Sequence, residues 1–400
     1  MWCFVETVGF RVAMPGEVIG NVIKRAVFSW PVRRSNAKAG DGLRRLLRVF
    51  SCGWRLPVFC TVAPMAAALQ PRQTVMTGAF YSCCAGLFAL WVAGAGAVDY
   101  PQRPLRVIVA NVPASGVDVL TRIVTARLGA VLGQQIVVDN RIDTRPGAGT
   151  AYGMEIGRNA APDGYTLNSA ATAALAITPV IYRQQPQAVL DDYEFISLFA
   201  ITPNLLVVTP TLALQTVVDL VAWSNTQPQV NMASGGAGSQ NHLAGVLLYT
   251  MGKFRAQHTP YRGSTAPVAA VISGESQWLL TPAPSVWPLV KAGQLRALAH
   301  SLSQRTALLG DLPAIAETIP GYDYSGWFGL VAPKGTPQPV LHKVRSALLQ
   351  VLARAEVREA FAAQASVTAA STPQEFRRFV LDEQARYGEV VKAAGLKPEP

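Results

Sequence analysis

The fold is decided by the stretch LRVIVANVPASGVDVLTRIVTARLGAVLG, which occupies residues 105–133. Residues 105–109 are rich in β-branched side chains and predict a buried strand. After a loop at residues 111–117, apolar side chains recur on one helical face, and Gly133 is a typical helix stop. A second strand is expected at residues 136–138, so the stretch predicts a strand–helix–strand unit with parallel strands.

Short strands and helices continue to alternate along the rest of the chain. Further strands are expected at residues 166–168, 205–208, 229–233, 277–280, 297–300 and 328–332. A helix is expected at residues 339–353, and a terminal helix follows Thr372-Pro373-Gln374-Glu375, a capping box with proline at the first helical position. The alternation predicts an α/β architecture, and 400 residues, half of them hydrophobic, favour two domains over one core.

The positive charge and the cysteines are both concentrated at the N-terminal end. Eleven Lys and Arg and three Asp and Glu precede Ala97, a net charge of +8, which leaves +3 of the total +11 for residues 98–400. This distribution removes the main reason to expect a nucleic-acid partner. All five cysteines also precede Ala97, so no disulfide and no cysteine metal site is expected in the folded part.

The N-terminal segment has the pattern of an export signal. The apolar run at residues 80–92 follows Arg72, and the small residues at 93–97 offer two cleavage sites, so residues 65–97 are interpreted as a cleaved signal peptide. An uncleaved anchor is the alternative, but a spanning helix needs roughly 20 residues. Residues 1–64 are Arg-rich and irregular, and we expect them to be disordered and to derive from a start codon assigned upstream of Met65 or Met76.

The loop between the first strand and its helix is a candidate anion site. Free backbone N–H groups and the positive end of the helix dipole attract anions, and ligands of open α/β sheets bind at this edge. The alternative is an ordinary strand-to-helix turn with Asp118 as the N-cap. The candidate ligand contacts are Pro113, Ala114, Ser115, Val117 and Asp118.

A second candidate loop has the sequence ASGGAGSQNH at residues 233–242. Its glycines allow close backbone approach, and Ser239 can cap the helix that follows. The candidate contacts here are Ser234, Gly238, Ser239 and His242. A hydrolase built on Ser239 and His242 is the competing hypothesis, but the two lie in one helical turn and no Gly-x-Ser-x-Gly motif surrounds the serine.

A third segment, Pro260-Tyr261-Arg262-Gly263-Ser264, precedes another expected helix. Tyr261 could form an aromatic wall, and the Arg262 guanidinium could bind a carboxylate. The alternative is a surface turn whose arginine is solvated. The remaining histidines lack the spacing of metal ligands, so no metal site is expected.

Taken in order, these segments resemble the Bug-type receptors, the periplasmic solute-binding components associated with tripartite tricarboxylate transport. The resemblance runs from residue 100 to about residue 395. Its motifs are YPQRP (100–104), LGQ (132–134), RPGAG (145–149), PDGYTL (162–167), GSQNHL (238–243), PYRG (260–263), GQLRALA (293–299), GWFG (326–329) and APKGTP (332–337).

The resemblance implies an α/β, two-lobed periplasmic-binding-protein fold (Venus-flytrap, type II) with two crossing strands near residues 195–206 and 327–332. Residues 98–202 and 327–400 would form one lobe and residues 203–326 the other. The family binds a ligand carboxylate through backbone amides and waters and needs no cofactor. By position, Thr172 falls in the third contacting segment.

The resemblance also implies a non-enzymatic, monomeric receptor that captures an organic acid in the periplasm and presents it to a membrane transporter. A receptor of the same fold that serves a signalling system is the alternative. Three features depart from the family. The first loop of the family is usually richer in glycine, so Ala114 and Ser115 are expected to narrow or re-aim the carboxylate pocket. An insertion is expected at residues 140–146, and residues 278–282, including Thr281, replace an Asp that can meet a ligand ammonium, which favours a simple carboxylate over an amino acid.

The signal-peptide interpretation makes a direct prediction about processing. Because the cleavage motifs end at Ala95 and Ala97, the exported protein should begin near Val98. N-terminal sequencing of periplasmic material tests this. A sequence that begins at Met1, or anywhere before Thr74, would contradict it.

Overall fold

The structure is a computed structural model that describes residues 99–142, 151–181 and 190–393. The described residues from Tyr100 onward belong to one compact unit. The predicted signal peptide, the upstream stretch and most of the expected insertion lie outside the described residues.

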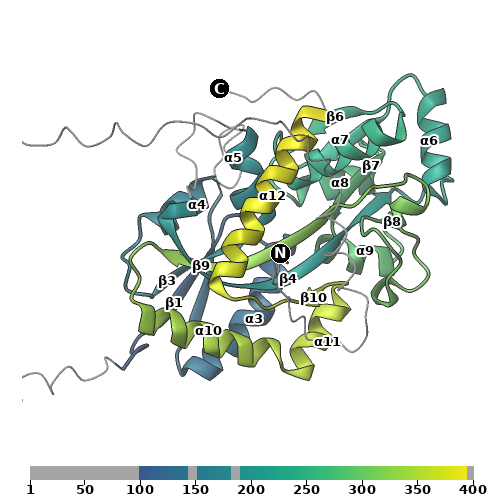
Figure 1. Cartoon of the computed structure of the whole chain (residues 1–400). Helices are drawn as coiled ribbons and strands as arrows, with labels where there is room; N and C mark the ends of the chain where they lie inside the picture. Colours follow the sequence, from purple (N-terminus) through teal and green to yellow (C-terminus); the bar gives the residue numbers. More distant parts are fainter. Residues whose placement is uncertain (1–98, 143–150, 182–189, 394–400) are drawn as a thin grey trace, which may run out of the picture. The chain divides into compact units, whose positions relative to one another are not determined.

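Ten strands form one mixed sheet in the described part of the chain (Figure 1). They are β1 Leu105–Val109, β2 Ile136–Asn140, β3 Thr166–Ala171, β4 Tyr193–Val208, β5 Asn231–Ser234, β6 Gln257–Pro260, β7 Trp278–Pro282, β8 Arg296–His300, β9 Ser325–Pro333 and β10 Val367–Thr368. The order is β2-β1-β3-β9-β4-β7-β5-β6, and β8 and β10 also pair with β4. The expected parallel units are confirmed, because β2, β1 and β3 are parallel neighbours, as are β6, β5 and β7.

The strands β4 and β9 join these two parallel groups. The first part of β4 pairs antiparallel with β9, and its last five residues pair with β7 and β8. On its other side β9 pairs antiparallel with β3. The expectation of two crossing strands is therefore confirmed, and β4 is longer than the segment predicted at residues 205–208.

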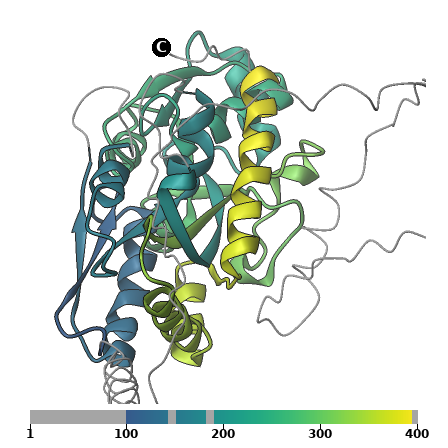
Figure 2. The same cartoon turned by 60° about the vertical axis from the view of Figure 1, so that its left-hand side comes forward.

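Helices cover the sheet and connect its strands. The longer ones are α3 Gly116–Leu132, α4 Ala151–Arg158, α6 Val217–Thr226, α7 Gln240–Gly252, α8 Ala266–Ser273, α10 Gln338–Leu352, α11 Ala355–Ala363 and α12 Pro373–Ala393. The short ones are η1 Ala173–Ile177, α5 Thr178–Ile181, η2 Leu190–Asp192, η3 Ala283–Ser285, α9 Trp287–Lys291, η4 Ala307–Leu309 and η5 Ile315–Glu317. The helices α3 and α10 share one apolar core with β1, whereas α12 lies against β4, η1 and α5 (Figures 1 and 2).

Local sequence explains where the main helices begin and end. The helix α3 ends at Gly133, whose φ of 72° is left-handed, as a C-cap glycine allows. The predicted capping box of α12 is present: the Thr372 amide donates to Glu375 Oε2 at 2.8 Å, and the Glu375 amide donates to Thr372 Oγ1 at 3.1 Å. The start of the terminal helix is thus confirmed.

Aromatic packing holds α12 against the crossing strand β9. The ring of Phe376 lies over Gly329, where a Cβ would come within 2.1 Å of the ring. Farther along α12, Glu383 accepts a hydrogen bond from Trp327 Nε1 at 3.1 Å and binds Arg386 at 2.8 Å. The helix is therefore attached to β9 at two levels.

Two glycine substitutions test this packing. Gly329→Ala should destabilise the protein by about 1 to 3 kcal/mol, because Phe376 must move to admit a methyl group. Gly388→Ala, inside α12 with nothing within 4 Å of its Cβ position, should instead stabilise by roughly 0.5 to 1 kcal/mol. Chemical denaturation measures both free energies of unfolding. Equal effects of the two variants would contradict the packing described for Gly329.

Candidate ligand-binding site

The helix α3, which follows the first loop, begins three residues earlier than it would with Asp118 as its N-cap. Ser115 is the N-cap, with φ −67° and ψ 158°, and its Oγ accepts from the Asp118 amide at 3.4 Å. The ordinary-turn alternative was therefore wrong about the capping residue. The spacing of Ser115 and Asp118 is that of a capping box, and this signal could have identified the cap from the sequence.

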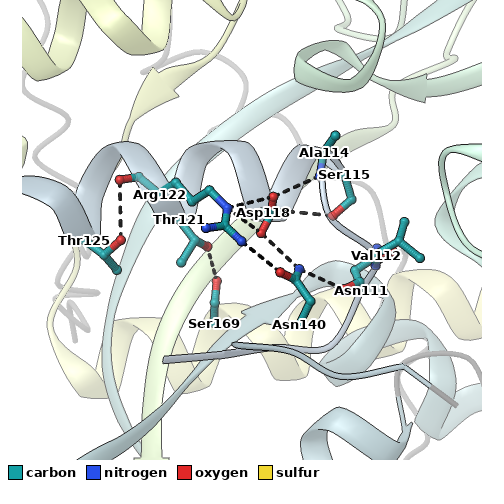
Figure 3. A network of polar contacts seen from close by, with 10 residues as sticks. All are labelled: Asn111, Val112, Ala114, Ser115, Asp118, Thr121, Arg122, Thr125, Asn140 and Ser169. Atoms are coloured by element: carbon teal, nitrogen blue, oxygen red, sulfur yellow. Dashed lines mark hydrogen bonds and ion pairs between the residues drawn. The ribbon is translucent and has the colours of Figure 1, made fainter. Parts of the chain in front are cut away.

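The Asp118 carboxylate organises this loop (Figure 3). It is 2% exposed and accepts from the Ala114 amide at 2.9 Å, from Arg122 Nε at 3.0 Å and from Asn140 Nδ2 at 3.0 Å. Ala114 has a left-handed φ of 60°, which a side chain disfavours, and the bond to Asp118 compensates for that strain. Asn140 Nδ2 also donates to the Asn111 carbonyl at 3.0 Å, so the carboxylate fixes the loop through its neighbours.

The helix start leaves donors available. Among the described residues, the amides of Gly116 and Val117 make no hydrogen bond, as expected for the first turn of a helix. Both belong to the 17-residue α3, whose dipole adds positive potential at this end. Pro113 has no amide hydrogen, and Ser115 uses its hydroxyl as the cap. The donors of the first loop are thus backbone amides.

The second loop is built in a similar way. Ser239 is the N-cap of α7, and its Oγ accepts from the His242 amide at 3.2 Å, which confirms the predicted cap. Gly238 has a left-handed φ of 71°, and its amide donates to His242 Nδ1 at 3.1 Å. Within the described chain, the amides of Gln240 and Asn241 have no acceptor.

Two stacked histidines support this second loop. The rings of His242 and His258 lie 3.9 Å apart between centroids, and His258 Nε2 lies 2.5 Å from the buried Ser234 Oγ. Burial lowers the pKa of His242 to about 3, aided by the neighbouring imidazole, and burial lowers the pKa of His258 to about 4. Both rings are neutral near pH 7. Because Nδ1 of His242 accepts from Gly238, its proton is on Nε2.

This arrangement does not provide the hydrolase geometry. The Ser239 hydroxyl accepts the backbone amide of His242, and the imidazole is occupied with Gly238 and His258. In the described part of the chain, no hydrogen bond joins Ser239 Oγ to a histidine ring, which a serine nucleophile and its base would need.

The two loops and the segment after β6 come together at the end of β7. Asn241 Nδ2 donates to the Leu280 carbonyl at 3.2 Å, and a Cβ on Gly116 would lie 3.1 Å from Pro282 Cβ. A Cβ on Gly263 would lie 2.9 Å from Val112 Cγ1. The free amides of α3 and α7 therefore lie on neighbouring parts of one site.

The other predicted contacts differ in their surroundings. Thr172 is fully buried, and its Oγ1 accepts from the Trp327 amide at 2.9 Å and donates to the Trp327 carbonyl at 3.2 Å. The Tyr261 hydroxyl donates to Glu275 Oε1 at 2.8 Å. The hydroxyls of Thr172 and Tyr261 therefore both have hydrogen-bond partners within the protein. Thr281 is buried, and its Oγ1 has no hydrogen-bond partner among the described residues.

Sequence reasoning missed several residues that shape the site. Asn111 and Asn140 brace the first loop, Asn241 ties the second loop to β7, and Ser264 reaches Asn111 from the third segment. Arg262 is exposed, as the surface-turn alternative predicts. A lone Asn after a strand has no distinctive pattern, so only its position in space shows these roles.

Two further observations concern metal binding and membrane spanning in the described part of the chain. No group of three or more His, Cys, Asp or Glu side chains could hold a metal ion there. No helix in the same part of the chain has the length and apolar character needed to cross a membrane.

A two-lobed α/β fold whose crossing strands join two parallel groups, with helix starts meeting between them, defines the class of periplasmic binding proteins. The chain belongs to the tripartite tricarboxylate transporter receptor family, whose model matches residues 120–396. BugT of Bordetella pertussis is 33% identical over 78% of this chain and 97% of its own length. The resemblance seen in the sequence motifs is confirmed.

Solved structures agree with this assignment. A periplasmic transporter is 31% identical, with a TM-score of 0.71 over 75% of this chain and all of that chain. R. palustris Rpa4515, solved with adipate, is 28% identical, with a TM-score of 0.72 and the same coverage. The family is one of transporter receptors.

The buried histidines predict how stability depends on pH. Unfolding returns His242, His258 and the similarly buried His300 to the ordinary pKa near 6.5, so the unfolded state binds more protons below that value. The contribution of these three histidines to stability should be complete well above pH 6.5 and fall by roughly 1 to 2 kcal/mol for each histidine between pH 7 and pH 5. Denaturant titrations at the two pH values measure this loss.

Matched variants identify the source of the loss. His242→Asn with His258→Gln keeps acceptors near the ring nitrogens without titrating, and it should reduce the pH dependence to the part that His300 contributes. His342→Ala, at an exposed position, should leave the slope as in the wild type. A slope unchanged in the double variant would contradict the role given to the stacked pair.

Proposed function

We propose that this chain captures a small organic acid by its carboxylate in the periplasm and presents it to a membrane transporter. The observation that carries the proposal is the set of unpaired amides at two helix starts, Gly116 and Val117 on α3 and Gln240 and Asn241 on α7, which meet at the end of β7. A relative 28% identical to this chain has been solved with adipate, which supports a carboxylate ligand.

Backbone donors suit a carboxylate better than a cation. A bond from an amide to an ionised oxygen contributes about 1.5 to 3 kcal/mol, and the two helix dipoles add to the attraction. The nearby Arg122 is already bound to Asp118 and Asn140, so the amides supply the main positive potential. An ammonium group would find Asp118 already paired with Arg122, which favours a simple carboxylate over an amino acid.

The predicted site residues take different roles in this proposal. Val117 offers its amide directly, and Thr281 offers a buried hydroxyl that can bond a second polar group of the ligand. The side chains of Ser115, Asp118, Ser234, Ser239 and His242, together with the backbone of Gly238, hold the two loops in shape. Pro113, Ala114, Thr172 and Tyr261 form the surroundings of the site.

Capture by closure fits the strand connections. Residues 98–202 and 327–400 would form one lobe and residues 203–326 the other, with β4 and β9 as the connection that bends. Such a receptor works as an exported monomer, needs no catalytic group, and meets its transporter after closing. Its signal peptide would be removed before Val98.

Direct binding tests the proposal. The purified protein should show a raised melting temperature with adipate or another small organic acid, because a ligand at 100 times its dissociation constant adds about 2.7 kcal/mol. Calorimetry with the best acid gives the affinity, and the matching primary amide serves as the uncharged control. If no acid in a broad screen binds, or if the amide binds equally well, carboxylate capture is wrong.

A matched pair of variants tests where the carboxylate binds. Asp and Asn are both good N-caps and nearly equal in size, so Ser115→Asp and Ser115→Asn should both preserve the start of α3. Only the aspartate places a negative charge beside the Gly116 and Val117 amides. Ser115→Asp should weaken binding at least tenfold relative to Ser115→Asn, measured by calorimetry. Equal affinities would place the carboxylate elsewhere.

A further inference from the structure

A hydrogen bond joins the first loop to the segment after β6. Ser264 Oγ donates to Asn111 Oδ1 at 3.0 Å, although the two residues are 153 positions apart. Asn111 follows β1, in the parallel group of β2, β1 and β3, whereas Ser264 follows β6, in the group of β6, β5 and β7. The bond therefore connects the two groups of strands directly and does not pass through β4 or β9.

The surrounding contacts are shaped for this approach. Gly263 has a left-handed φ of 71°, and a Cβ there would lie 2.9 Å from Val112 Cγ1, so the absence of a side chain lets the two loops meet. On the same side, a Cβ on Gly235 would lie 2.8 Å from the Gly263 carbonyl. The third segment thus packs between the first and second loops.

Asn111 is held ready to accept this bond. Its Oδ1 also accepts from the Val112 amide at 2.8 Å, which fixes the side chain, and its carbonyl accepts from Asn140 Nδ2. Asn140 in turn binds Asp118, the residue that shapes the first loop (Figure 3). A bond made to Asn111 therefore acts on the same framework that positions the amides of α3.

We infer that Asn111 and Ser264 form a latch between the lobes that slows release of the bound acid. The inference rests on the proposed function, since it names the contact that keeps the closed receptor around its carboxylate. A bend of β4 and β9 that parts the lobes must break this bond before the ligand can leave, whereas capture starts from open lobes, in which the bond is absent. Without ligand, the bond still forms whenever the two loops meet. Loss of the hydroxyl should therefore change the dissociation rate and leave the association rate unchanged.

Hydrogen exchange of the full chain tests the latch without any ligand. A neutral hydrogen bond of this kind corresponds to a two- to tenfold effect, so Ser264→Ala should speed exchange of the amides at residues 111–117 by that factor. Ser264→Thr, which keeps the hydroxyl, should behave as the wild type. Ser273→Ala is the matched control, because that hydroxyl makes only local bonds: it donates to the Ala270 carbonyl at 3.0 Å and accepts from the Glu275 amide at 3.5 Å. Unchanged exchange at residues 111–117 in Ser264→Ala, or an equal change in Ser273→Ala, overturns the latch.

Stopped-flow binding of adipate supplies the kinetic measurement. Ser264→Ala should raise the dissociation rate two- to tenfold with an association rate within error of the wild type, and Ser264→Thr should restore slow release. An unchanged dissociation rate in Ser264→Ala overturns the latch even if adipate binds well. If neither adipate nor any other acid binds, the proposed function fails, and the exchange measurement still decides whether the two loops are latched.

Discussion

The first turn of a helix cannot satisfy its own amides, and this constraint organises the ligand site. Gly116, Val117, Gln240 and Asn241 lie in the first turns of α3 and α7, and no acceptor for their amides is found in the described chain. Donors left in this way stabilise whatever anion reaches them. The sheet matters because it brings both helix starts to the end of β7, where, under the proposed function, their four amides bind one carboxylate.

A buried carboxylate and two buried imidazoles hold those amides in place. One side uses the Asp118 carboxylate, neutralised by Arg122 and shared with Ala114 and Asn140. The other side uses two neutral imidazoles, with His242 accepting the Gly238 amide and His258 meeting Ser234. In each loop, a side chain accepts from the amide of a residue with left-handed φ, Ala114 in the first loop and Gly238 in the second, so the loops are held in shape before any ligand arrives. Stiff donors lose little entropy on binding.

Periodicity in the sequence predicted most of the fold. The β-branched run at residues 105–109 identified β1, and the capping pattern at Thr372 located the start of α12. The strand β6 was missed because its sequence, QHTP, has neither alternation nor β-branched enrichment and is held by its pairing with β5. The length of β4 was underestimated because its first half is a strand through its long-range pairing with β9.

The site was predicted less completely, for a physical reason. Short-range rules identify helix starts, and they located both loops and the Ser239 cap. They cannot say which polar side chain faces inward. Asp118 therefore looked like a ligand contact although its carboxylate is occupied within the protein, and the bracing contacts of Asn111, Asn140 and Ser264 were not predicted. Such roles depend on pairs of residues separated by tens to hundreds of positions.

Amide chemical shifts test the central claim most directly. In a ¹⁵N-labelled protein, saturation with the acid that binds tightest should move the amide proton signals of Gly116, Val117, Gln240 and Asn241 downfield together, as expected for new bonds to a carboxylate. The amides of Asp118 and His242, which already donate to Ser115 and Ser239, should move much less. Tight binding that leaves those four signals in place would show that the carboxylate is held elsewhere and would contradict the account.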